Sequence, residues 1–152
     1  MSNSRKKIDG SAISPLMKTL ATYMAGAAKK PLPKAVAEKT KHHLLDTIAA
    51  MVSGSRLLPG RKAINYVKTL GGRPEAIVIG SGIVTNAEQA ALANGMLAHA
   101  DETDDSHAPS LSHPGCAVVP AALAMGEREK ASGTLLLRAV ALGYDIGSRI
   151  NM

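Results

Sequence analysis

The residues most able to do chemistry lie in one short stretch between His99 and Pro114. This stretch reads HADETDDSHAPSLSHP and carries seven ionisable side chains in sixteen positions. They are His99, Asp101, Glu102, Asp104, Asp105, His107 and His113. Carboxylates this close repel one another and, where buried, need a cation, a hydrogen-bond donor or a ligand beside them. Alanine-rich apolar segments flank the stretch on both sides, so this density of charge indicates a functional site.

Three interpretations of this stretch compete. Histidine, aspartate and glutamate are all metal ligands, but their spacing matches neither the H-E-x-x-H motif nor the EF-hand loop, so we expect no bound metal. A solvated helix end would carry similar charges, although the apolar flanks make full exposure difficult. The third interpretation is general acid–base chemistry on a small polar substrate, carried out by a histidine that titrates near neutral pH and a carboxylate.

The orientation of these side chains depends on where the preceding helix ends. If that helix continued through Ser106, residues spaced three, four and seven apart would share one face. The inward set would then be His99, Glu102, Thr103 and Ser106. The outward set would be Asp101, Asp104 and Asp105, which would cap or brace the following loop. His113 would return to the same cavity at the start of the next helix.

Helices are the elements that must position this stretch. Apolar periodicity, capping residues and proline or glycine stops predict helices over residues 14–27, 36–54, 60–70, 85–97, 114–125 and 134–150. Only Ala76–Ile79 is β-prone, and such a short strand either pairs with chain beyond this sequence or is an extended connector. We therefore predict an all-α, helical bundle-like domain over residues 12–152 with at most one short strand. Residues 1–11 are polar and basic and predict a disordered leader.

Composition narrows the class of protein further. The chain has 152 residues, of which 45% are hydrophobic and 20% charged, as in one soluble globular domain. The net charge of +6 is compatible with nucleic acid, but the only aromatic residues are three tyrosines, so we expect no nucleic-acid partner. An acidic small molecule suits the surplus of cations equally well. A single cysteine, no secretory signal and no apolar run of about 20 residues predict a cytoplasmic protein without a membrane partner.

Several motifs resemble those of the MmgE/PrpD family. The segment NGMLAHADETDDSH, followed by SHPGCAVVPAALA, is similar to a family pattern of a histidine, two residues, D-F-D-D-T, a short loop and H-P. Glu102 stands in place of the first aspartate, Thr103 in place of the phenylalanine and Ser106 in place of the threonine. The loop before His113 is one residue longer than in some members. The segments HLLDTIA from His43 and GYDIGSRI from Gly143 resemble two further family segments.

The resemblance implies a function and a set of site residues. Members of this family are metal-independent and act on di- and tricarboxylic acids by dehydration, decarboxylation or epimerisation, so the resemblance implies a lyase or isomerase of the 2-methylcitrate dehydratase type without a cofactor. The resemblance and the chemistry of the side chains assign proton exchange to His113 and Glu102, and substrate binding to Ser106 and His99. Asp104 and Asp105 are kept from the family pattern and are expected to brace the site.

The resemblance covers only the N-terminal helical segment of the family. The family's smaller α/β lid and further active-site positions lie beyond Met152, so whether this chain is an enzyme by itself stays open. We expect a small carboxylic acid as substrate, and either a homo-oligomer or a complementing C-terminal chain as partner. The alternative function is a non-catalytic helical interaction module or a subunit of a split enzyme.

Overall fold

The computed structural model describes residues 13–27 and 29–152 of the chain, so the expected leader over residues 1–11 lies outside the described residues. Contacts divide the chain into two compact units that meet between Lys30 and Pro31. The first unit contains helix α1, Pro15–Ala27. The hydroxyl of Ser14 accepts a hydrogen bond from the Met17 amide, 3.2 Å away, as the predicted N-cap should.

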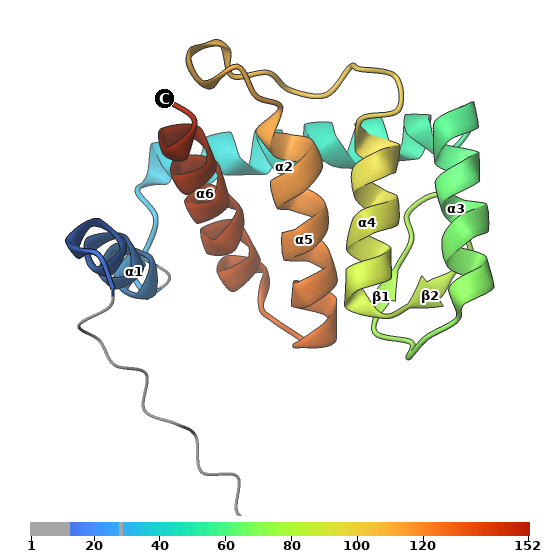
Figure 1. Cartoon of the computed structure of the whole chain (residues 1–152), viewed down its shortest axis with the longest axis horizontal. Helices are drawn as coiled ribbons and strands as arrows, with labels where there is room; N and C mark the ends of the chain where they lie inside the picture. The colour runs from blue at the N-terminus through green and yellow to red at the C-terminus, as the bar shows by residue number, and fades with distance from the viewer. Residues whose placement is uncertain (1–12, 28) are drawn as a thin grey trace, which may run out of the picture. The chain divides into compact units, whose positions relative to one another are not determined.

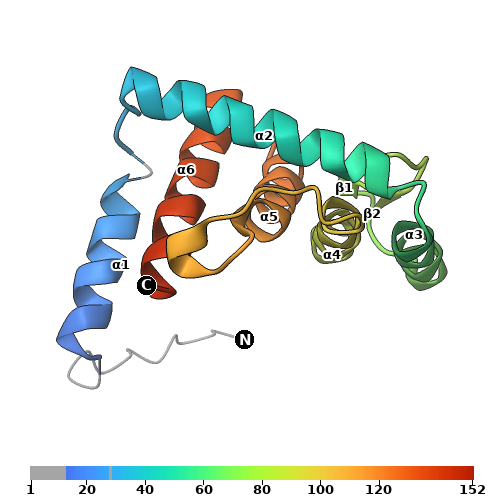
Figure 2. The same cartoon turned by 90° about the horizontal axis from the view of Figure 1, so that it is seen from above.

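The second unit holds the remaining elements and confirms the all-α prediction. Its helices are α2 (Lys34–Gly54), α3 (Leu58–Leu70), α4 (Ala87–Ala98), α5 (Pro114–Arg128) and α6 (Gly133–Ile150). A 3₁₀ turn, η2 (Ala108–Ser110), and two short strands, β1 (Ala76–Ile77) and β2 (Val84–Thr85), complete it. Helices α3 to α6 stand side by side in one row, and α2 runs across that row (Figures 1 and 2). None of the described helices combines the length and apolar character needed to cross a membrane.

Helix α4 lies at the centre of the core because its side chains are small. Four of its alanines and Leu97 are buried. Gly54, at the end of α2, passes so close to the Leu97 carbonyl that a Cβ atom there would clash with the α4 backbone. Small residues on both sides thus let α2 cross directly over the C-terminal end of α4, where the charged stretch begins.

The β-prone stretch pairs within the chain. Strand β1 is antiparallel to β2, with Ala76 opposite Thr85 and Ile77 opposite Val84. The buried Asn94 of α4 holds this hairpin: its amide donates to the Ile77 carbonyl at 3.0 Å, and its oxygen accepts from the Ile79 amide at 2.9 Å. The partner of this strand is therefore β2 of the same chain, and not a segment beyond this sequence.

Helix α4 begins one residue later than its sequence motif predicts. Asn86, rather than Thr85, is the N-cap, and its side chain accepts from the Gln89 amide at 2.9 Å. Thr85 is instead the last residue of β2, and its hydroxyl donates to the Gly71 carbonyl at 2.6 Å. Strand pairing therefore takes priority over the capping role of Thr85.

We predict that Asn94→Ala destabilises the fold by about 1–3 kcal/mol, because the Ile77 carbonyl and the Ile79 amide both lose the buried side chain that bonds them. Urea unfolding followed by circular dichroism measures this loss. Asn65→Ala on the exposed side of α3 is the matched control and should change the free energy of unfolding by less than about 0.5 kcal/mol. Equal effects of the two substitutions would contradict the clamping role of Asn94.

Candidate active site

The charged stretch is a loop that follows the predicted helix end, and the helix does not continue through Ser106. Helix α4 ends at Ala98 with His99 as its C-cap, and Glu102 adopts a left-handed backbone conformation with φ of 56°. The Asp101 carboxylate accepts hydrogen bonds from the Thr103 amide and hydroxyl, which forms a local turn that competes with the helix. Carboxylates are also unfavourable at the negative end of a helix dipole. The predicted shared face of inward-pointing residues therefore does not form.

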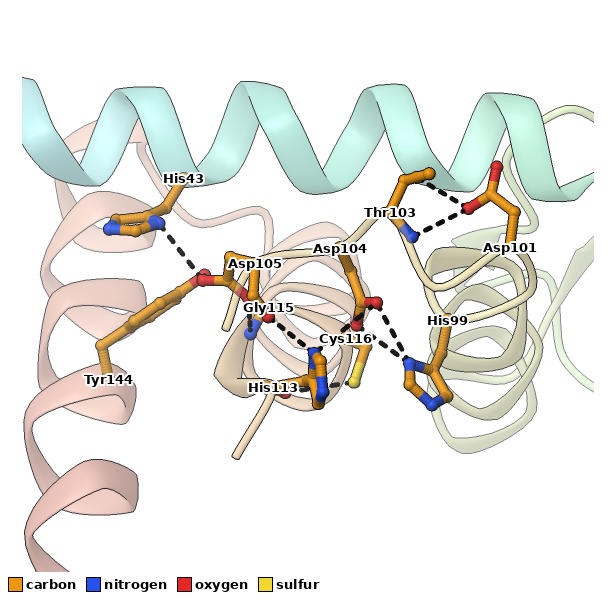
Figure 3. A network of polar contacts seen from close by, with 10 residues as sticks. All are labelled: His43, His99, Asp101, Thr103, Asp104, Asp105, His113, Gly115, Cys116 and Tyr144. Atoms are coloured by element: carbon orange, nitrogen blue, oxygen red, sulfur yellow. Dashed lines mark hydrogen bonds and ion pairs between the residues drawn. The ribbon is translucent and has the colours of Figure 1, made fainter. Parts of the chain in front are cut away.

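Asp104 lies inside the site, in contrast to its expected outward orientation. Its side chain is 0% exposed and lies between two imidazoles (Figure 3). The Nδ1 atom of His99 is 3.1 Å from both carboxylate oxygens, and the Nδ1 atom of His113 is 3.8 Å from Oδ1. The two rings have centroids 5.3 Å apart and are tilted by 56°. The structure thus brings His99 and His113 together around one buried carboxylate.

His113 has a defined hydrogen-bonding geometry. Its Nδ1 atom is 2.9 Å from the backbone carbonyl oxygen of Asp105. Because a carbonyl can only accept, Nδ1 carries the proton, and Nε2 of the neutral ring is free to take up another. His113 directly precedes α5, so the start of that helix fixes the position of its backbone.

Asp105 faces a second set of partners. Its Oδ1 accepts from the Gly115 amide at 2.8 Å, in the first turn of α5, and its Oδ2 accepts from the Tyr144 hydroxyl at 2.7 Å. The Nδ1 atom of His43 is 3.2 Å from the same Oδ2. Burial, followed by the neighbouring Asp105 carboxylate, raises the pKa of the Tyr144 phenol far above its ordinary value, so the phenol stays a donor. Asp105 therefore joins the loop to three helices.

The three segments that carry the sequence resemblance meet at this carboxylate. His43 comes from α2, Gly115 from α5 and Tyr144 from α6. Sequence reasoning assigned no site role to His43 or Tyr144, because nothing in their local spacing connects them to the charged stretch. The only sequence signal was that both residues lie in segments similar to the family's.

Glu102 and Ser106 are not joined to the histidine cluster. Both are exposed, and within residues 13–27 and 29–152 neither side chain makes a hydrogen bond or ion pair. Their roles in proton exchange and substrate binding stay predictions.

Asp101 fastens the loop to α2. The Ser53 hydroxyl donates to its Oδ2 at 2.8 Å, and hydrogen bonds from Thr103 and then Ser53 lower the pKa of the Asp101 carboxyl. Asp101 thus has a bracing contact of the kind expected for the outward set, while Asp104 and Asp105 lie inside.

His99, Asp104 and His113 also offer one potential metal-ligand atom each, all within 4.8 Å of one another. The hydrogen bond to the Asp105 carbonyl occupies only Nδ1 of His113, so Nε2 is the atom that this ring would offer to a cation. The expected absence of metal stays a prediction.

Comparison with known proteins defines the class of this chain. Residues 18–152 match the MmgE/PrpD N-terminal domain, and the chain therefore belongs to the MmgE/PrpD family. It is 26% identical over 151 residues to the cis-aconitate decarboxylase of Aspergillus terreus, covering 96% of this chain and 31% of that protein. It is 27% identical over 138 residues to the cis-aconitate decarboxylase-like protein oryM of Aspergillus oryzae, covering 86% and 29%. The chain thus spans about a third of the length of these relatives.

We predict that Gly115→Ala disrupts the site, because a Cβ atom would lie 2.6 Å from Oδ1 of Asp105, 2.7 Å from Oγ1 of Thr47 and 2.9 Å from the Tyr144 hydroxyl. Overpacking of this kind costs about 1–3 kcal/mol. Thermal unfolding measures the loss. Gly126→Ala in the same helix is the control, since its new Cβ would approach only Leu136 at 3.8 Å, and it should leave stability unchanged or raise it.

Cys116 should react slowly with alkylating agents. Burial and the nearby Asp104 carboxylate raise the pKa of its thiol to about 11, so at pH 8 roughly a thousandth of it is thiolate. The rate of iodoacetamide labelling should rise steeply from pH 8 towards pH 11. Asp104→Asn should accelerate labelling at pH 8, whereas Asp101→Asn, which removes a carboxylate bonded to Ser53 and Thr103, should not. A labelling midpoint near pH 8.5 in the unaltered chain would contradict this assignment.

Proposed function

We propose that this chain supplies the histidine-bearing helical part of a lyase-type enzyme that acts on a di- or tricarboxylic acid by metal-independent acid–base chemistry. The observation that carries the proposal is the pair of imidazoles of His99 and His113 around the buried Asp104 carboxylate. Membership of the MmgE/PrpD family and the relatives named as cis-aconitate decarboxylases support it. Because the chain spans about a third of those relatives, the activity belongs to a completed assembly.

His113 suits the role of proton donor and acceptor. Its Nδ1 donates to the Asp105 carbonyl, which leaves Nε2 to exchange a proton with a substrate carbon. In a decarboxylation, the bond to the departing carboxylate breaks and carbon dioxide leaves. The electron pair that stays on carbon then accepts a proton that Nε2 has taken up beforehand from water, and the ring returns to its neutral form with the proton on Nδ1. In a dehydration, a base removes the proton beside a carboxylate while an acid protonates the departing hydroxyl, which leaves as water.

The remaining site residues supply substrate contacts in this proposal. The imidazole of His99, which is 47% exposed, and the hydroxyl of Ser106 bind substrate oxygens, and Glu102 serves as the second proton-exchanging group. Both imidazoles open to solvent, since the His113 side chain is 44% exposed. A second subunit or a complementing C-terminal chain would close this open side and exclude water. The proposed substrates include 2-methylcitrate-type and cis-aconitate-type acids.

Binding of tricarboxylates to the chain alone provides the first test. We expect cis-aconitate and citrate to bind weakly, with a dissociation constant on the order of 1 mM, and to shift the side-chain NMR signals of His99 and His113. The signals of His42, an exposed residue of α2, report non-specific effects and should stay in place. Equal shifts at all three histidines, or none at His99 and His113, would contradict the proposal.

Turnover provides the second test, with the chain alone or with any natural chain that completes it. The isolated chain should show little or no lyase activity and should self-associate. In an assembly that turns over cis-aconitate or 2-methylcitrate, His113→Ala should lower the rate by ~10² to 10⁴, as expected for the loss of a general acid–base group. His42→Ala is the matched control and should retain the full rate; equal loss in both variants would show that the role assigned to His113 is wrong.

A further inference from the structure

We propose that Asp104 is a positioning residue that fixes the tautomer of His99. It holds His99 with the proton on Nδ1, as the Asp105 carbonyl does for His113, so that both free Nε2 atoms face the same open side of the loop. The inference about geometry is independent of substrate, and only its use in catalysis rests on the proposed function.

The buried Asp104 carboxylate needs a hydrogen-bond donor. Its side chain is 0% exposed, and its ion-pair partners among the described residues are the two histidines. An ionised carboxylate can only accept hydrogen bonds, and it is costly to bury without donors. The Nδ1 atom of His99 lies 3.1 Å from both oxygens, so Nδ1 must carry a proton that points into the carboxylate.

His113 depends on Asp104 to a smaller degree. Its Nδ1 atom donates to the Asp105 carbonyl at 2.9 Å and is 3.8 Å from Asp104, too far for a hydrogen bond. The backbone of Asp105 therefore fixes the tautomer of His113, whereas the side chain of Asp104 fixes that of His99. This difference makes the role of Asp104 separable by experiment.

The arrangement presents two equivalent nitrogen atoms to one ligand. With both Nδ1 atoms occupied, both Nε2 atoms point away from α2 and towards the same side (Figure 3). The ring centroids are 5.3 Å apart and both side chains are about half exposed, so one small molecule can contact both rings. His99 thereby becomes a second proton acceptor beside His113, and it can bind a carboxylate oxygen once Nε2 has taken up a proton.

Long-range ¹H–¹⁵N NMR of the ¹⁵N-labelled 152-residue chain tests the assignment, at a pH high enough that each ring carries one proton. We expect the unaltered chain to show protonated Nδ1 in both His99 and His113. In Asp104→Asn, the single amide oxygen cannot replace both carboxylate oxygens, and the amide NH₂ competes to face His99. His99 should then shift largely to the Nε2-protonated tautomer, while His113 keeps its proton on Nδ1.

Asp101→Asn is the matched control, because Asp101 lies in the same loop but bonds Ser53 and Thr103. It should leave both tautomers unchanged. A proton on Nε2 of His99 in the unaltered chain, an unchanged His99 in Asp104→Asn, or the same switch in both variants would overturn the proposal. The unaltered chain decides the question even if Asp104→Asn does not fold. Failure of tricarboxylate binding with intact tautomers would count against the proposed function alone.

Discussion

The burial of the Asp104 carboxylate is the constraint on which the rest of the site depends. A carboxylate without exposed surface destabilises a fold by several kcal/mol unless hydrogen bonds and charge compensate it. Here the hydrogen bond comes from Nδ1 of His99, and Nδ1 of His113 lies 3.8 Å from the same carboxylate. The two histidines stand at the two ends of the loop. The loop must therefore close on itself, and it returns from the end of α4 to the start of α5 with both rings facing one carboxylate.

The two neighbouring aspartates have different partners, because their side chains point in different directions from the loop (Figure 3). Asp104 faces the histidines, whereas Asp105 faces the scaffold. Asp105 accepts from the Gly115 amide at the positive end of the α5 dipole and from the Tyr144 phenol. The terminus of α5 and the Tyr144 hydroxyl thus stabilise the charge of Asp105. The histidines therefore remain as partners for Asp104. A glycine at position 115 is required, because a methyl group would fill the space between these partners.

The sequence predicts the helices well and the orientation of the charged side chains poorly. Apolar periodicity, Ser14 with Pro15 and the stops at Gly54 and Gly71 are local signals, and the structure places helices where these signals indicate them. The loop conformation is not local: it depends on the hydrogen bond from Ser53 of α2 and on the start of α5. The helix dipole of α4, taken alone, gives no reason for the side chains of Asp104 and Asp105 to lie inside the site.

The three segments that resemble the family contain residues that no spacing in the sequence connects. His43, Gly115 and Tyr144 are far apart in the sequence, and their common feature is contact with one carboxylate. A substitution of any residue that contacts the Asp105 carboxylate alters a contact between the loop and a helix. Glu102 and Ser106 are exposed, and within residues 13–27 and 29–152 their side chains make no hydrogen bond or ion pair. Of the three departures from the family pattern, Thr103 bonds Asp101 within the loop, whereas Glu102 and Ser106 are exposed. Asp104 and Asp105, which are kept from that pattern, lie where the fold holds them.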